Sequence, residues 1–123
     1  MTDLSDIALA FCRECLGWHN ATKGDWPFSE LIGNGPLPGS ECFGFADLNT
    51  VMDAVRAWLT EQEDLGLLFG INRHGDYLAQ VQDECYSPSA VVGGDIYRSE
   101  GNPCRALMEA CLEAARKLKG EAA

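Results

Sequence analysis

Residues 47–82 read DLNTVMDAVRAWLTEQEDLGLLFGINRHGDYLAQVQ, and this stretch decides the fold class. Its first half predicts a helix over about 48–62, because apolar residues recur at helical spacing and form one stripe. Asp47, directly before that stripe, is expected to cap the helix. Its second half predicts two strands over 66–72 and 76–82, since apolar residues alternate along each of them. A helix followed by a hairpin indicates an α+β fold.

Two more helices are predicted outside this stretch. Apolar residues recur at helical spacing over about 4–16, and Gly17 is placed to end that helix in a left-handed conformation. A longer helix is expected to end near Lys119. It has Asn102 as its cap and Pro103 in its first turn, where a proline removes no helical hydrogen bond. The sequence therefore predicts three amphipathic helices.

The segment 18–46 is rich in glycine and proline, which argue against a long regular element there. We expect short strands within it, one of them over 41–45. Two weaker strands, 90–92 and 95–98, are expected on either side of Gly93-Gly94. This order of elements predicts an α+β fold built as a layered α-β-α sandwich, with a mainly antiparallel sheet and three amphipathic helices.

The chain carries 9 Lys+Arg and 19 Asp+Glu, a formal net charge of −10 over 123 residues. Its length fits a single domain, 1–123. The acidic balance argues against binding to nucleic-acid phosphates or to anionic membranes, which requires clustered cations. Between residues 25 and 100 there are 13 acids and only three basic residues, Arg56, Arg73 and Arg98. We therefore predict neither a nucleic-acid nor a membrane partner.

The expected compartment follows from what the sequence lacks. No apolar run approaches the roughly 20 residues needed to span a bilayer. The N-terminal residues show neither the basic region nor the apolar core of a signal peptide. A cytoplasmic location is therefore expected, and the six cysteines are expected to be free thiols rather than a disulfide framework.

Three blocks of the sequence carry a family resemblance. They are a first helix ending in Leu16-Gly17-Trp18, a helix opening at Asp47–Val55 and a closing helix that starts Pro103–Ala110. In these blocks the chain resembles the small phage and prophage proteins of the phage ABA-sandwich domain family. The resemblance implies a layered α-β-α sandwich and a phage or prophage setting inside a bacterial host, and it implies no catalytic activity. Phage anti-defence proteins that sequester cyclic ADP-ribose signals are distantly similar in layout.

The most metal-like cluster is Cys12-x-x-Cys15 with His19 four residues later. A structural zinc site needs four S or N ligands, usually from two paired knuckles, and no second CxxC occurs here. We therefore expect Cys12 and Cys15 to pack as small apolar residues on a helix, and we predict no metal and no other cofactor. A metal-binding, Cys-rich protein stays open as an alternative.

The remaining motifs are typical of turns and solvated surfaces. The stretch Gly33–Gly39 lacks the Lys-Ser/Thr pair and the following helix of a phosphate loop. His74-Gly75-Asp76 stands where the hairpin needs a turn. The acids near 61–64 and 83–84 share no calcium-loop spacing. No catalytic motif occurs, so we predict that the protein is not an enzyme; an uncharacterised enzyme would need a histidine in a cleft beside a nucleophile.

Five of the eleven aromatic residues fall in the glycine-rich segment: Trp18, Trp26, Phe28, Phe43 and Phe45. Burial in the core is the usual position of such residues. If exposed, Trp18, Trp26 and Phe28 would form a partner-binding patch rimmed by acids.

The favoured function is a non-enzymatic phage or prophage accessory protein that acts by binding, as an acidic inhibitor of a host protein. The alternative is a protein that sequesters a nucleotide-type signal, for which Arg56, Arg73 and Arg98 are the candidate ligand-binding residues. Such a site would need at least two of these arginines in one pocket, which an interface in a homo-oligomer could provide. Pairing of the arginines with neighbouring acids is their more ordinary use.

Overall fold

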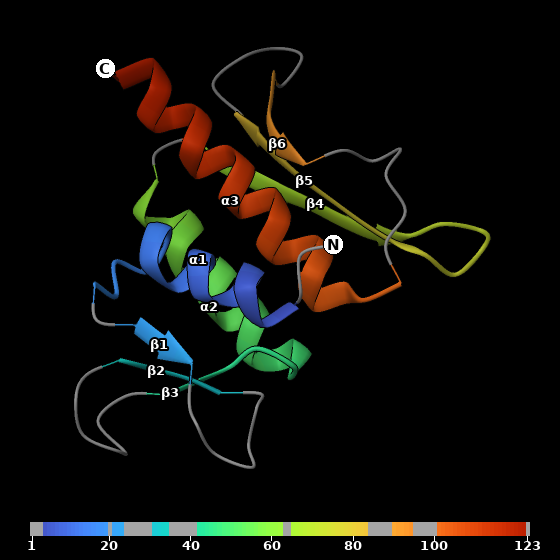
Figure 1. The fold of residues 1–123 in the computed structure, drawn as a ribbon. Helices are drawn as coiled ribbons and strands as arrows, with labels where there is room; N and C mark the ends of the chain where they lie inside the picture. The colour runs from blue at the N-terminus through green and yellow to red at the C-terminus, as the bar shows by residue number, and fades with distance from the viewer. Residues whose placement is uncertain are drawn as a thin grey trace.

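The computed structural model describes residues 4–19, 21–23, 31–34, 42–62, 65–83, 90–94 and 101–122, and the structural statements below concern these residues. The elements follow one another along the chain as shown in Figure 1. They are α1 (Leu4–Glu14), β1 (Ala21–Lys23), β2 (Leu31–Asn34), β3 (Cys42–Gly44), α2 (Leu48–Glu61), β4 (Leu65–Ile71), β5 (Tyr77–Asp83), β6 (Ala90–Gly94) and α3 (Pro103–Ala122).

The strands form two small antiparallel sheets, with the orders β1-β2-β3 and β4-β5-β6. The α+β class with three helices and antiparallel strands is confirmed. The layers differ from the single covered sheet that the sequence predicts, because the three helices lie between the two sheets (Figure 1). In that arrangement α1 packs against β1 and β2, whereas α3 packs against β5 and β6.

The helix α1 is joined to the first sheet at its C-terminal end. Gly17 has the predicted left-handed backbone, with a φ of 73°, and the helix ends two residues earlier than predicted, at Glu14. The guanidinium of Arg13 donates two hydrogen bonds to the Ala21 carbonyl, at 2.9 and 3.3 Å. The rings of Phe11 and Phe43 lie 5.7 Å apart between α1 and β3. These contacts hold the small sheet against α1.

The helix α2 and the hairpin that follows it agree with their sequence prediction. Asp47 caps α2 by accepting hydrogen bonds from the Asn49 N–H at 3.3 Å and from the Thr50 hydroxyl at 2.8 Å. In the turn between β4 and β5, the side-chain oxygen of Asn72 accepts from the backbone N–H groups of two turn residues, which fixes the local chain path. Gly75 has a φ of 84°, a conformation that a side chain disfavours.

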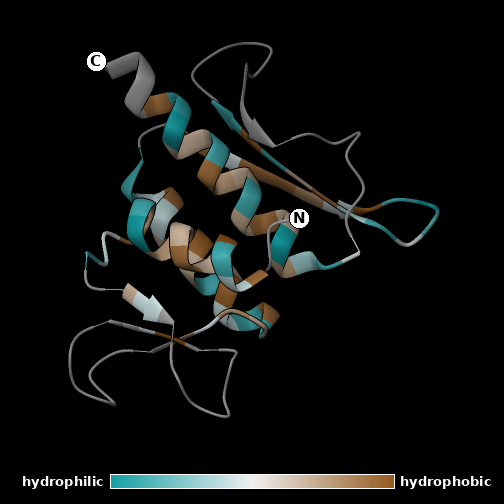
Figure 2. Ribbon diagram, viewed as in Figure 1, coloured by the Kyte–Doolittle hydropathy of each residue, from teal (hydrophilic) through white to brown (hydrophobic). Residues whose placement is uncertain are grey.

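The helix α3 is the centre of the fold, because it contacts α1, α2, β5 and β6. The side-chain oxygen of Asn102 accepts from the N–H groups of Cys104 and Arg105 at 2.9 and 3.4 Å, so the predicted cap is confirmed. The buried residues occupy most faces of this helix: Cys104, Ala106, Leu107, Met108, Ala110, Cys111, Leu112, Ala114 and Ala115. Figure 2 shows hydrophobic and hydrophilic segments alternating along it.

The last strand differs from its prediction. Two short strands were expected on either side of Gly93-Gly94, but β6 runs through both glycines and pairs them with Gln80 and Val81 of β5. The predicted strand 95–98 lies outside the described residues. A register shift between Val81 and Gln82 interrupts the pairing, which allows the glycine end of β6 to follow β5.

Candidate functional site

The helices α1 and α3 lie side by side although they come from opposite ends of the sequence (Figure 1). The guanidinium of Arg116 on α3 donates to both carboxylate oxygens of Glu14 on α1, at 2.9 and 2.8 Å. This hydrogen bond also raises the pKa of Arg116. A two-point guanidinium–carboxylate pair constrains orientation as well as distance, so it links the two helices at one register.

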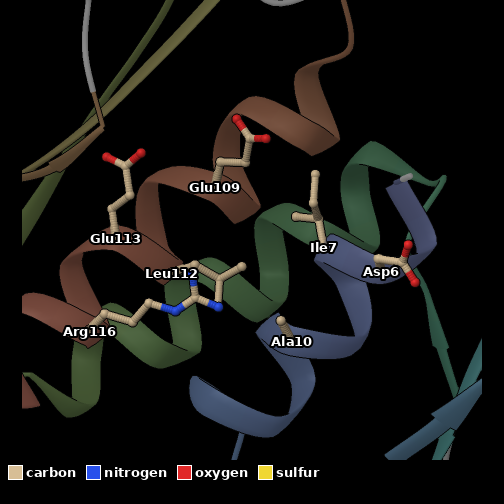
Figure 3. Close-up of a pocket in the computed structure, with 7 residues that line it drawn as sticks. All are labelled: Asp6, Ile7, Ala10, Glu109, Leu112, Glu113 and Arg116. Carbon is tan, nitrogen blue, oxygen red and sulfur yellow. The ribbon is translucent and has the colours of Figure 1, made fainter. Parts of the chain in front are cut away.

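A cavity of about 310 Å³ opens between these helices, and its lining residues are drawn in Figure 3. Its apolar part is formed by Ile7 and Ala10 of α1 and by Leu112 of α3, and both Ile7 and Leu112 are buried. The polar part of the lining is made of three carboxylates and one guanidinium, from Asp6, Glu109, Glu113 and Arg116. We call this feature the α1–α3 cleft.

The charges around the α1–α3 cleft are held in place by neighbours. Arg105, one turn before Glu109 on α3, donates to its carboxylate at 3.1 Å. Arg116 donates to both carboxylate oxygens of Glu14. The lining side chains thus comprise three carboxylates and one guanidinium above an apolar floor. Such a surface suits a cationic group on an aliphatic stem, because the stem packs on apolar atoms while the charge meets carboxylates.

A second hollow of about 320 Å³ lies between α2 and β4, and its lining is mostly apolar. The residues around it are Met52, Asp53, Val55, Arg56, Leu59 and Leu67. Arg56, one of the predicted ligand-binding arginines, is thus at the edge of a groove, with Asp53 beside it in the lining.

The three predicted arginines are not assembled into one pocket by the described structure. Arg73 lies on the exposed turn between β4 and β5, with its Nε 3.4 Å from Nε2 of His74, and it does not line the groove that contains Arg56. Arg98 lies outside the described residues.

The aromatic residues of the glycine-rich segment pack inward wherever the structure describes them. Phe43 and Phe45 are buried. Trp18 is half-buried and meets Phe43 edge-on, with ring centroids 6.4 Å apart and an interplanar angle of 84°. The other two members of the predicted partner-binding patch, Trp26 and Phe28, lie outside the described residues.

The three residues of the metal-like cluster lie in different environments. Cys12 and Cys15 are buried, whereas His19 is exposed. Burial raises the pKa of the Cys12 thiol to about 12, which opposes the thiolate form that a metal ligand requires. Within the described ranges, no group of three or more His, Cys, Asp or Glu side chains is arranged to hold a metal ion.

Both histidines lie on the surface. His74 is exposed in the hairpin turn, where its backbone N–H donates to the Asn72 side chain at 2.8 Å. Neither His19 nor His74 lines either of the two hollows described above.

Comparison with protein-family models, curated proteins and solved structures found no match to this chain. In the part of the chain that the structure describes, no helix combines the length and the apolar character required to cross a membrane.

The α1–α3 cleft is a site that the sequence interpretation did not anticipate. Asp6, Glu109 and Glu113 each look like residues on a solvated helix face. One local signal was present: Glu109 and Glu113 stand four positions apart on α3, and a like-charge pair at that spacing disfavours a helix by a few tenths of a kcal/mol. The i,i+4 ion pair between Arg105 and Glu109 offsets that repulsion, so the spacing alone did not mark a site.

Proposed function

We propose that this protein is a non-enzymatic accessory protein that acts by binding a basic segment of a protein partner in the α1–α3 cleft. The phage or prophage setting and the bacterial cytoplasm belong to this proposal on the strength of the family resemblance of the three sequence blocks. The observation that carries the binding role is the combination of an apolar floor with the carboxylates of Asp6, Glu109 and Glu113 in one cavity.

The chemistry of the lining favours a lysine or arginine side chain over other ligands. Ile7, Ala10 and Leu112 can pack against the methylene groups of such a side chain, and its charge can meet the carboxylates (Figure 3). A host protein that presents a basic segment would also be attracted over longer distances by the net charge of −10.

A nucleotide-type ligand is less well supported. Its phosphates would be repelled by the carboxylates of the α1–α3 cleft. Among the described residues, the groove between α2 and β4 has one arginine in its lining, Arg56, together with Asp53. A thermal-shift assay with cyclic nucleotides distinguishes the two functions: we expect no stabilisation, and a concentration-dependent rise of the melting temperature would favour the nucleotide-sequestering function instead.

The proposal is tested with a short peptide of alternating lysine and leucine, titrated into isotope-labelled protein near physiological salt. We expect backbone amide shifts to concentrate in the segments 6–10 and 109–116. Neutralising two carboxylates of the cleft, in the double variant Asp6→Asn/Glu113→Gln, should weaken peptide binding at least about five-fold. Both side chains are exposed, so the variant is expected to fold.

A matched control distinguishes the effect of the cleft carboxylates from the effect of the overall charge. The double variant Asp53→Asn/Glu61→Gln removes the same charge from exposed positions of α2, and it should change the affinity less than about two-fold. Equal losses in the two double variants would mean that the peptide is held by net charge alone. Shifts confined to other elements would place the binding surface elsewhere and contradict the proposal.

A further inference from the structure

The strand β4 is at the end of its sheet, since it pairs only with β5 among the described strands. Its sequence LGLLFGI contains no charged residue and no proline. Proteins usually protect such an edge with charges, prolines or a covering element, because its unpaired backbone groups can pair with another chain. Among the described residues, the outer edge of β4 therefore has no strand partner and carries neither a charge nor a proline.

The backbone groups at this edge can be assigned from the hairpin register. The Asn72 N–H donates to the Asp76 carbonyl at 3.0 Å, so these residues form a hydrogen-bonded pair. Hydrogen-bonded and non-hydrogen-bonded pairs alternate along an antiparallel ladder. Counting back along the register, Leu67 and Phe69 belong to non-hydrogen-bonded pairs with β5, so their N–H and C=O groups point away from it. Leu65 and Ile71 share that direction.

Two large apolar side chains of β4 are also left exposed to solvent. Among the described residues, the two most exposed large hydrophobic side chains are Ile71, at 63%, and Leu68, at 51%, and both lie on this strand. The packing of one chain does not require a glycine at position 70, because a Cβ placed there would meet nothing within 4 Å in the described structure. A glycine inside a strand weakens it and often marks close approach of another backbone.

The strand is complementary to itself when it is reversed. In an antiparallel pair of two β4 strands centred on Leu68, Gly66 of one copy stands opposite Gly70 of the other. Leu65 stands opposite Ile71, and Leu67 opposite Phe69. Large side chains thus meet large ones and glycine meets glycine. This register also makes Leu67 and Phe69, whose backbone groups point outward, a hydrogen-bonded pair across the new edge.

The charges on either side of β4 favour the antiparallel direction. The chain before β4 carries acids, including Glu61 at the end of α2, and Arg73 follows β4 in the exposed hairpin turn. Reversal brings the acidic end of one strand beside the basic end of the other. Since β4 itself has no charged residue, no like charges stand opposite each other within the pair.

We infer that two copies of this chain associate through their β4 edges into a two-fold symmetric dimer with one continuous sheet. The contact pairs Leu68 with Leu68 at the symmetry axis, where opposite side chains of a non-hydrogen-bonded pair come closest. It covers the exposed Leu68 and Ile71 side chains. The α1–α3 cleft is lined by residues of other elements, so this association is independent of the proposed function.

The test uses the charge at position 68, because that residue faces itself across the axis. Sedimentation should give wild-type protein a mass of twice the 13.4 kDa of one chain. Leu68→Lys and Leu68→Glu should each be monomeric under the same conditions, since each places like charges opposite each other. An equimolar mixture should form the dimer again, at least about tenfold more tightly than either variant alone. Leu68 is half-exposed, so both variants are expected to fold.

Thr22→Lys is the matched control, because it adds the same charge to an exposed position of an edge strand in the other sheet. It should leave the dimer unchanged. Hydrogen exchange supplies an independent readout: the amides of Leu67 and Phe69 should become protected as the protein concentration rises. A wild-type protein that stays monomeric up to about 1 mM overturns the inference. So does a mixture of the two charge variants that associates no better than its components.

Discussion

Cys12 is a residue whose ionisation is strongly altered by the fold. Its side chain is fully buried, and desolvation raises its pKa from 9.0 to about 12. Above pH 9 the unfolded chain therefore loses a proton that the folded protein keeps. Because the folded state then binds more protons, the free energy of unfolding should fall as the pH rises from about 9 toward 12. The limiting slope for one thiol is about 1.4 kcal/mol per pH unit.

Urea unfolding of wild-type protein and of Cys12→Ala, each at about pH 8 and about pH 10.5, measures this effect. The alanine variant should lose less stability between the two pH values than the wild type does. Some loss should remain in the variant, because burial also raises the pKa of Cys111 and of Cys104. Identical losses in the two proteins would show that the Cys12 thiol does not contribute to the pH dependence.

The residues that sequence reasoning placed correctly are those whose role is local. Asp47 and Asn102 cap the helices that follow them because each side chain reaches a backbone N–H only two residues away. Gly17 adopts a left-handed conformation for an equally local reason. Cys12 and Cys15 are predicted to pack as small apolar residues on a helix. Both are buried, although Cys15 lies one position beyond the end of α1.

At the scale of an element, α3 depends on its first turn. The Asn102 side chain accepts from two otherwise unpaired N–H groups, at 2.9 and 3.4 Å. Asn102→Ala should therefore lower the free energy of unfolding by about 1 kcal/mol, whereas Asn102→Asp should retain most of it. Chemical unfolding of the three proteins provides the comparison. An aspartate variant as destabilised as the alanine variant would contradict a capping role.

The strands were predicted less completely than the helices. The hairpin β4–β5 has seven-residue strands in which apolar side chains recur at every second position, and this pattern predicts it. The strand β1 has three residues, too few to show a period, and it is held by Arg13 of α1 and by pairing with β2. The division of the strands into two sheets depends on which helix face each one meets, and no local pattern encodes that choice.

At the scale of the whole molecule, the core depends on α3. Leu107 is fully buried, on the helix that contacts both other helices and the β5–β6 part of the second sheet. Leu107→Ala should cost about 3 kcal/mol, since truncation leaves a cavity that close-packed neighbours cannot fill. Leu48→Ala, at a position 36% exposed, is the matched control and should cost less than about 1 kcal/mol.

Circular dichroism and tryptophan fluorescence should follow the same unfolding curve in the Leu107→Ala variant. A loss no larger than that of the Leu48→Ala control would show that α3 is not the centre of the packing. Two separated transitions would show that the two sheets unfold independently of the helix between them.

The candidate site could not have been found from the charge map of the sequence. That map places most acids between residues 25 and 100, whereas the α1–α3 cleft takes its carboxylates from Asp6, Glu109 and Glu113 in the nearly neutral terminal segments. Roughly a hundred positions separate the two halves of the lining, as they do for the Glu14–Arg116 pair. Only the packing of α1 on α3 brings them together.

The packing of α1 on α3 also affects the order in which the chain can fold during synthesis. Glu14 and Arg116 are 102 positions apart. A ribosome must therefore make almost all of this sequence before α1 can pack against α3. Until then the apolar faces of α1, α2 and the second sheet have emerged without the helix that covers them, which is the situation in which nascent chains recruit chaperones. Closing so large a loop also slows the search for the native arrangement. We therefore expect the first hundred residues to stay loosely collapsed until α3 has been synthesised.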